Sequence, residues 1–131
     1  MLFDKEFLDR ISKAASQNPR LRTNFDLRNS DKDHSQRMLN ALHPGTVLPI
    51  HRHPSTSETL IMVRGSICQR FYNDKGEVTD TFTLKAGSDC AALQIPAGQW
   101  HCLECLEEDT VIFEAKDGAY VPVSPEDIMK I

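Results

Sequence analysis

The sequence lacks an apolar run of about 20 residues, the length that a helix needs to cross a membrane. Its first stretch, MLFDKEFLDRISKAA, carries early acidic residues and no long apolar segment of the kind found in signal peptides, so we expect a cytoplasmic protein without a membrane partner. Basic residues are also few: 15 Lys and Arg stand against 19 Asp and Glu, which gives a net charge of −4 at pH 7. Nucleic acids and anionic membranes require a basic face, and this composition argues against either partner.

Cysteines are too few, and in the wrong context, to indicate a disulfide framework. Four cysteines in a chain without an export signal favour reduced thiols. Cys102 and Cys105 form a single C-x2-C pair with no second pair, and on a strand they would face opposite sides, which argues against a zinc knuckle or redox pair. We expect Cys68 and Cys90 to be small core residues.

The chain has 131 residues, of which 40% are hydrophobic, and this suits one globular domain. Residues 4–17 show apolar residues at helical spacing, with Asp4 as a cap and Asn18-Pro19 as the stop, so we predict a helix there. The stretch that follows, up to residue 34, is polar and irregular, and we interpret it as a loop or arm.

The rest of the chain alternates short strand patterns with turn signals every ~8–12 residues, which predicts a β-sandwich or barrel. The predicted strands span residues 35–42, 58–64, 66–72, 77–84, 90–96, 100–105 and 110–115. A short helical turn is predicted near the end, with Ser124 as cap and Pro125 in its first turn. We therefore expect an N-terminal helix and arm (1–34) and a barrel (35–131) within one structural domain.

The stretch GTVLPIHRHPSTSETLIMVRG, residues 45–65, contains His51 and His53, which do not contribute to an apolar core. On a strand, His51 and His53 would project from the same side, because side chains alternate with a period of two. Glu58 follows a small turn that can bring the next strand alongside, and His101 follows a Pro-x-Gly turn that would aim it inward. Imidazole and carboxylate together suit Zn, Fe, Mn, Ni or Co rather than Ca or Mg.

This spacing resembles the two sequence motifs of the cupin superfamily. The matching patterns are Gly45-x5-His51-x-His53-x4-Glu58-x6-Gly65 and Pro96-x-Gly98-x2-His101, with Cys90 and Cys105 where the second motif usually has Gly and Asn. Both departures fall on positions that do not bind metal. The resemblance implies an all-β, single-domain double-stranded β-helix (jelly-roll) barrel. It also implies that His51, His53, Glu58 and His101 hold one divalent transition metal such as Zn, Fe, Mn or Ni.

A narrower likeness covers most of the chain. The segments PRLRTNFDL, QRMLNAL, HRHP, IPAGQWH and FEAKDGAYVP resemble WbuC-type cupin-fold metalloproteins, small bacterial proteins associated with surface-polysaccharide gene clusters, although Ala119 stands where that group tends to have Pro. The likeness favours a metal-binding cupin that acts on a small sugar or sugar-nucleotide substrate. The expected reaction is an isomerisation or a related step with the metal as Lewis acid, or an oxygenase reaction if the metal is iron. Small cupins often pair through sheet edges, so we also expect a homodimer.

Other residues are candidates for the chemistry around such a metal. As acid or base groups we name Glu114, Tyr72 and Tyr120. As residues of a substrate pocket we name Gln36, Met38, Asn40, Arg70 and Trp100, although each polar one could equally face solvent and Trp100 is more typical of a core. An anionic group of the substrate could be held by Arg22, Arg37 or Arg70.

Two alternatives to an enzyme remain at this stage. The metal could hold a small ligand in a non-catalytic binding or sensing module, or it could be structural, with no ligand at all. A general acid or base within reach of an open metal position would favour the enzyme, whereas a closed and dry site would favour the structural metal. The fold alone does not decide between them, because jelly rolls have many functions.

Overall fold

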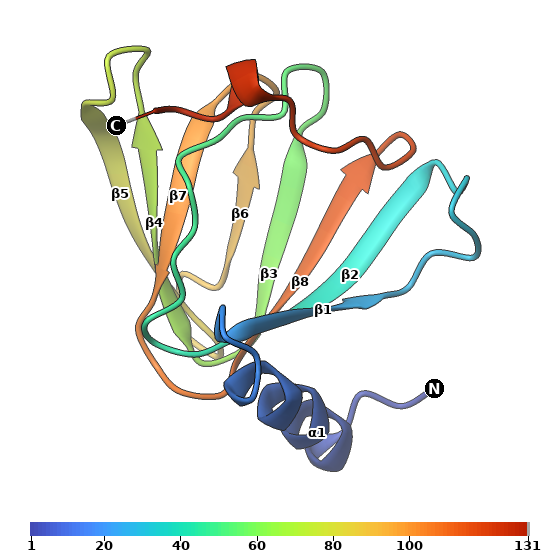
Figure 1. The fold of residues 1–131 in the computed structure, drawn as a ribbon. Coiled ribbons are helices and arrows are strands. Elements are labelled where there is room, and N and C mark those ends of the chain that lie inside the picture. The colour runs from blue at the N-terminus through green and yellow to red at the C-terminus, as the bar shows by residue number, and fades with distance from the viewer. Residues whose placement is uncertain (131) are drawn as a thin grey trace.

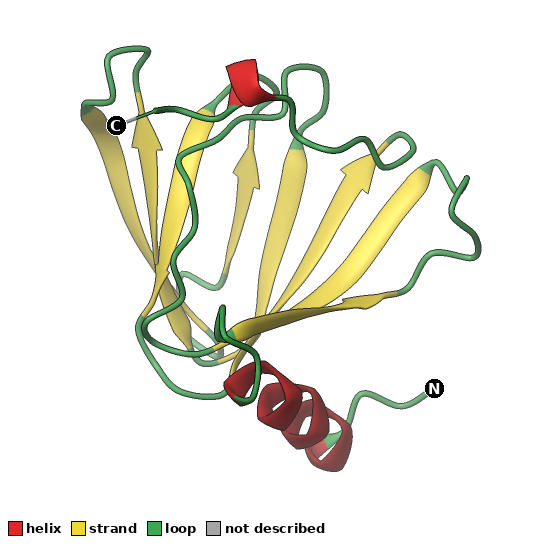
Figure 2. Cartoon of the chain, in the orientation of Figure 1, coloured by secondary structure: helices red, strands yellow, loops and turns green. Residues whose placement is uncertain are grey.

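The computed structural model describes residues 1–130, which form two antiparallel β-sheets that face each other and one helix outside the larger sheet (Figure 1). The elements are α1 (Lys5–Ser16), β1 (Arg22–Asp26), β2 (Ser35–Leu42), β3 (Glu58–Arg64), β4 (Ser66–Tyr72), β5 (Val78–Lys85), β6 (Ala92–Ile95), β7 (Trp100–Cys105), β8 (Thr110–Asp117) and η1 (Pro125–Asp127). The larger sheet has the order β1-β2-β8-β3-β6 and the smaller one the order β5-β4-β7. The all-β jelly-roll expectation is confirmed, with strands dominating the chain (Figure 2).

Helix α1 forms where the apolar periodicity predicts it. The Asp4 carboxylate accepts a hydrogen bond from the Phe7 amide at 3.0 Å, which caps the first turn. The buried face of the helix packs against side chains that point outward from β2 and β8. This cluster consists of Phe7, Leu8, Ile11, Ala15, Leu39, Ala41 and Val111. The helix therefore covers the outer face of the larger sheet and leaves the interior free.

The polar stretch after the helix is not entirely a loop or arm, contrary to the prediction. Residues 22–26 form strand β1, which pairs antiparallel with β2 over its whole length. Its sequence, RTNFD, has no regular alternation of apolar residues, because Arg22 and Asn24 face the polar interior of the barrel while Phe25 packs against the helix cluster. Pairing with β2, and not local propensity, makes this segment a strand.

One end of the space between the sheets is filled by apolar side chains. This cluster consists of Leu42, Leu60, Met62, Ile67, Phe71, Leu84, Ile95, Cys105 and Ile112. Cys68 is buried, as predicted, but Cys90 is exposed because it lies in the turn between β5 and β6; all four cysteines are free. The chain therefore fills one end of the barrel and leaves the other end to polar residues.

The segment that carries His51 and His53 is not a regular strand, contrary to the prediction. Within residues 43–57, only His51 makes β-bridges, one to His101 and one to Ile128. After β8 the chain crosses the open end of the barrel, shown in red in Figure 1, and includes the predicted helical turn at η1. This crossing is anchored by Asp127, whose carboxylate accepts from the Arg52 guanidinium at 2.9 Å. Among residues 1–130, no helix is long and apolar enough to cross a membrane.

Candidate metal centre

Backbone hydrogen bonds bring the two halves of the site together. The amide of His51 donates to the carbonyl of His101 at 3.1 Å, and the amide of His101 donates back to the carbonyl of His51 at 2.9 Å. The carbonyl of His53 accepts from the amide of Gly98 at 2.8 Å, in a turn where Gly98 has φ +81°. The loop that carries His51 and His53 is thus joined to the start of β7, although 50 positions separate His51 from His101.

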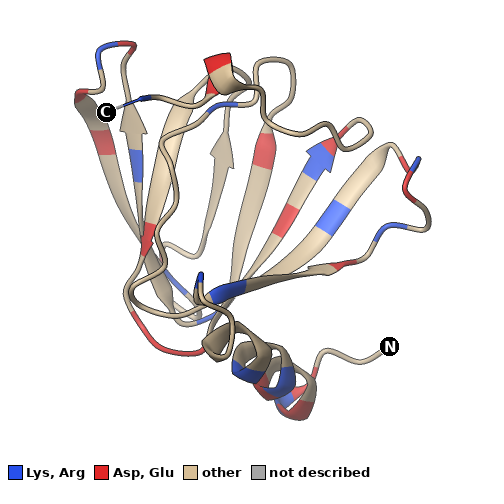
Figure 3. Ribbon diagram, in the orientation of Figure 1, with Lys and Arg blue, Asp and Glu red and all other residues tan. Residues whose placement is uncertain are grey.

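Strand register delivers the carboxylate to the same place. Glu58 is the first residue of β3 and lies opposite Lys116 of β8 and Ile95 of β6. Its side chain is buried, with 5% of the residue exposed. Figure 3 shows charged residues on the neighbouring strands β3 and β8 of the larger sheet.

The four predicted ligands meet at one point. The potential ligand atoms of His51, His53, Glu58 and His101 all lie within 4.8 Å of one another. The carboxylate of Glu58 lies 2.6 Å from Nε2 of His53 and 3.6 Å from Nε2 of His101, and Lys116 Nζ lies 3.8 Å from the same oxygen. A single ion could contact all four side chains with only small movements.

The outward-facing ring nitrogens define which nitrogen is available to a metal. Nδ1 of His51 lies 3.0 Å from the carbonyl oxygen of Pro49, and Nδ1 of His101 lies 2.8 Å from that of Gln99. A carbonyl oxygen can only accept, so Nδ1 carries a proton in both rings, and Nε2 is the nitrogen that faces the cluster and could bind a metal. Such hydrogen bonds from the second nitrogen are typical of metal-binding histidines, because they hold the ring in position.

The protonation states of the cluster also suit a cation. Burial, together with the neighbouring charges of His101 and His53, lowers the pKa of His51 to about 4, so this ring is neutral at pH 7. Burial by itself would raise the pKa of Glu58, but hydrogen bonds with His101 and His53 and the charge of Lys116 outweigh it and hold the pKa below its usual range. The cluster thus offers a neutral imidazole at His51 and an ionised carboxylate at Glu58.

These donors fit one divalent transition metal, since imidazole nitrogen with a carboxylate is a set that such ions prefer. Cys102 lies nearby but does not join the cluster, because its thiol donates to the carbonyl of Leu48 at 3.1 Å and burial raises its pKa. Four protein ligands leave positions free on an ion that takes five or six.

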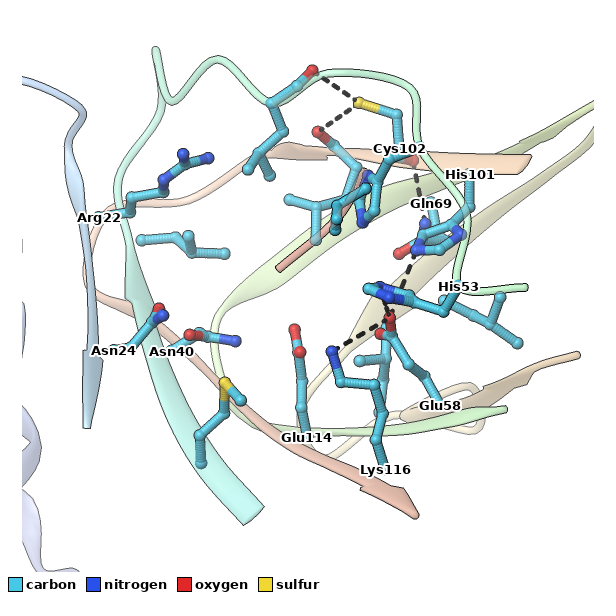
Figure 4. A pocket seen from close by; sticks show the side chains of 18 of the residues that line it. Arg22, Asn24, Asn40, His53, Glu58, Gln69, His101, Cys102, Glu114 and Lys116 are labelled. Carbon is cyan, nitrogen blue, oxygen red and sulfur yellow. Dashed lines mark hydrogen bonds and ion pairs between the residues drawn. The ribbon is translucent and has the colours of Figure 1, made fainter. Parts of the chain in front are cut away.

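A cavity of about 300 Å³ opens next to the metal ligands (Figure 4). All four ligands line it. Of the other residues named from the sequence, Met38, Asn40, Glu114, Tyr120 and Arg22 line it as well. Met38 and Asn40 reach it because they lie on the inward face of β2, where Met38 pairs with Glu114 of β8. The site is therefore neither closed nor filled by apolar side chains.

Glu114 has the properties of a proton carrier. Burial, and then the negative charge of Glu58, raise its pKa to about 7, against the smaller opposing effects of Lys116 and Asn40. In Figure 4 its carboxyl group points into the cavity between Asn40 on one side and Lys116 and Glu58 on the other. A carboxyl group of this kind can give or take a proton near neutral pH.

Five residues named from the sequence lie outside this cavity. Arg70 and Tyr72 alternate with the inward-facing Gln69 and Phe71, so they lie on the outer face of the smaller sheet, where Arg70 pairs with Glu104 at 3.4 Å. Trp100 is buried, and its indole donates to Asp74 at 3.0 Å.

Gln36, the fourth, donates to the carbonyl of Gly118 at 2.9 Å and lines a separate cavity of about 380 Å³ behind the C-terminal crossing. Arg37 does not line the main cavity either, since it pairs with Asp33 at 3.0 Å.

The sequence analysis missed several residues that line the cavity: Arg20, Asn24, Gln69 and Lys116. Two of them carry a signal that period-two alternation could have revealed. Gln69 falls on the apolar face of β4, between Ile67 and Phe71, and Lys116 shares a face of β8 with Glu114. Asn24 and Arg20 depend on β1, which the sequence did not indicate.

Comparison with solved structures shows the cupin fold. Oxalate oxidase in complex with glycolate matches with a TM-score of 0.63 and 14% identity over 83% of this chain and 57% of that one. KdgF from Halomonas sp. matches with a TM-score of 0.62 and 14% identity over 79% of this chain and 84% of that one. Oxalate decarboxylase from Bacillus subtilis matches with a TM-score of 0.59 and 19% identity over 84% of this chain and 27% of that one.

Sequence comparison gives a shorter match and a family. A germin-like protein from Morus alba is 43% identical over 60 residues, which cover 46% of this chain and 27% of that protein. The family described as a domain of unknown function, DUF6016, matches residues 3–84, more than half of the chain. The protein is therefore a metal-binding chain of cupin fold that belongs to the DUF6016 family.

Proposed function

We propose that this protein is a metal-dependent enzyme that acts on a small sugar-type substrate. The observation that carries the proposal is the shared cavity: the four metal ligands and the partly buried carboxyl group of Glu114 line the same open space. A structural metal would not need such a cavity, and a binding module would not need a buried group that titrates near pH 7.

The roles follow from where the side chains lie. When bound, the metal would act as a Lewis acid toward a substrate oxygen. Glu114 would hold or accept a proton at its carboxyl oxygens, because its pKa of about 7 allows both forms at neutral pH. Lys116 would keep Glu58 ionised through their 3.8 Å separation. Tyr120 lines the cavity from the C-terminal crossing and would help to exclude water above the substrate.

Two likenesses support the choice of substrate and metal. The resemblance to WbuC-type proteins favours a sugar of bacterial surface polysaccharides. The Bacillus subtilis oxalate decarboxylase, which has the same fold, contains Mn(II) centres, so Mn²⁺ is the first metal to test. We also propose that the protein is cytoplasmic and forms a homodimer. The dimer could use the edges of β1, β5 or β6, each of which has one partner strand within the described residues.

The metal is tested by elemental analysis of protein purified without a metal-affinity column. We expect one equivalent of a divalent transition metal in the wild type and its loss in His51→Ala and His101→Ala. His34→Ala is the matched control, because His34 is exposed and lies outside the cluster. Wild type without stoichiometric metal, or ligand variants that keep it, would contradict the site.

The enzyme is distinguished from a binding or sensing module by Glu114→Gln. This change keeps the shape of the side chain and removes its acid–base function. For an enzyme, the variant should bind sugars and nucleotide sugars in thermal-shift assays as the wild type does but should convert them at least about 100-fold more slowly. Equal metal-dependent binding by both proteins, with no turnover by either, would favour the binding module.

A further inference from the structure

The main cavity has a cationic end that no acidic side chain within residues 1–130 neutralises. Arg20 and Arg22 both line it, and within residues 1–130 neither guanidinium forms an ion pair. The Arg22 side chain donates one hydrogen bond, to the carbonyl oxygen of Val47 at 3.3 Å. Burial and the neighbouring positive charge of Arg20 lower the pKa of Arg22. The repulsion between the two guanidinium groups is therefore not offset by a nearby carboxylate within residues 1–130.

Five of the other six arginines are paired with acids. The pairs are Arg28 with Asp26, Arg37 with Asp33, Arg52 with Asp127, Arg64 with Asp9, and Arg70 with Glu104; the sixth, Arg10, lies over the ring of Phe7 on helix α1, away from the cavity. In a chain whose net charge is −4, two adjacent arginines that face a cavity and lack acidic partners indicate a place for an anion from outside the chain.

The same cavity contains acceptors that lack donors. Gln69 is 1% exposed, and its amide nitrogen donates to the carbonyl of Cys102 at 3.0 Å, which leaves Oε1 as an acceptor. This oxygen and Oδ1 of Asn40 are buried and have no hydrogen-bond partner within residues 1–130. A buried acceptor without a donor is costly, and a ligand hydroxyl would satisfy it.

Arg22 and the metal ligands lie on different sides of the cavity, with one of the two buried acceptors near each of them. In Figure 4, Arg22 stands across from His53, Glu58 and His101, while Gln69 lies on the side of the metal ligands. Strand register explains the arrangement on the Arg22 side, because β1 pairs Asn24 with Asn40. A ligand in this space would therefore contact a cationic group at one end and the metal at the other.

We propose that the cavity binds a monosaccharide-sized polyhydroxylated anion, with its carboxylate or phosphate group against Arg20 and Arg22 and its hydroxyl groups donating to Gln69 and Asn40. The inference rests on the proposed function and names the substrate class of the same site. The volume of about 300 Å³ is at the lower end for ligand pockets, so it favours a single sugar acid or sugar phosphate over a nucleotide sugar.

The test uses isothermal titration calorimetry of the Mn²⁺-loaded protein at constant ionic strength. The probes are glucuronate, galacturonate and mannuronate, the 6-phosphates of glucose, galactose and mannose, and the three parent hexoses. At least one acid or phosphate should bind about ten-fold or more tightly than its parent hexose, since hydrogen bonds between charged groups are stronger than neutral ones. Comparing the sugar acids with the sugar phosphates shows which anionic group the site binds more tightly.

The variants assign that preference to the arginines. Arg22→Gln should lose about ten-fold in affinity for the anionic probe while its affinity for the parent hexose stays unchanged. Arg20→Gln is the second variant, because no hydrogen bond or ion pair of the described chain involves its side chain and folding should be unaffected. Arg70→Gln removes the same charge outside the cavity and should behave as the wild type.

The inference is wrong if no anionic probe binds more tightly than its parent hexose, or if both cavity arginine variants keep the wild-type preference. Metal analysis of each sample separates this result from a failure of the proposed function. Protein that holds its metal without preferring anions refutes only the anion site. Protein that holds no metal refutes the metal-dependent function. In that case the same titrations are carried out on the metal-free protein, and the anion site is again judged by whether an anionic probe binds more tightly than its parent hexose.

Discussion

The stability of the metal-free protein between pH 7 and pH 5 should depend on two groups of the cavity that act in opposite directions. Folding lowers the pKa of His51 from 6.5 to about 4, so the unfolded chain takes up a proton in this interval and the folded chain does not. Folding raises the pKa of Glu114 from 4.5 to about 7, so in this case the folded chain takes up the proton. Acidification therefore costs stability through His51 and adds stability through Glu114.

The two contributions are similar in size. Integrating the difference in bound protons from pH 7 to pH 5 gives a loss of about 2 kcal/mol for His51 and a gain of about 2 kcal/mol for Glu114. Glu58, whose folded pKa is lowered from 4.5, contributes stability that is lost only as the pH falls below about 4.5, so it plays little part in this interval. In the wild type, the contributions of His51 and Glu114 to the change in unfolding free energy should nearly cancel.

Single substitutions should reveal the separate contributions of His51 and Glu114 to the free energy of unfolding. On acidification from pH 7 to pH 5, metal-free His51→Gln should gain about 2 kcal/mol of unfolding free energy relative to the wild type, and Glu114→Gln should lose about 2 kcal/mol. Urea unfolding followed by circular dichroism at both pH values measures this, with His34→Gln as the control outside the cluster. If both variants show the pH dependence of the wild type, the protonation states assigned to the cavity are wrong.

Three further predictions concern other parts of the molecule. Glu58→Gln should weaken metal binding by more than about ten-fold, measured by competition with a chelator, because it removes the only carboxylate of the cluster; an unchanged affinity would exclude Glu58 as a ligand. Leu39→Ala should cost about 2–5 kcal/mol in urea unfolding, because Leu39 is 1% exposed between the helix and the sheet; a cost under about 1 kcal/mol would contradict that packing. Gly65→Ala should destabilise more than Gly87→Ala in the same assay. Both glycines have positive φ, but a Cβ on Gly65 would lie 2.8 Å from Thr110 Cα and one on Gly87 would meet nothing within 4 Å, so equal costs would refute the close approach.

Much of the fold is determined by local sequence patterns. The helix at α1 follows from its apolar spacing and the Asp4 cap, and the seven predicted strands follow from alternation and turn residues, so their positions agree with the structure to within a few residues. The fixed spacing of His51, His53 and Glu58 indicates a metal cluster for a similar reason, since few other roles need these residue types together.

Other features depend on contacts between distant segments. The strand at β1 exists because β2 pairs with it, and Gln36, Arg70, Tyr72 and Trp100 fall outside the main cavity because register and the C-terminal crossing determine which side chains face it.

The chemistry of the cavity is decided in the same way. The raised pKa of Glu114 requires burial near Glu58, and the guanidinium of Arg22 has no ion pair within residues 1–130 because the fold places no acidic side chain of that range beside it. Residue types and their spacing thus predicted from the sequence alone the four side chains that cluster in the structure. Only the tertiary structure decided what surrounds them, because desolvation and charge act over distances in space and not along the chain.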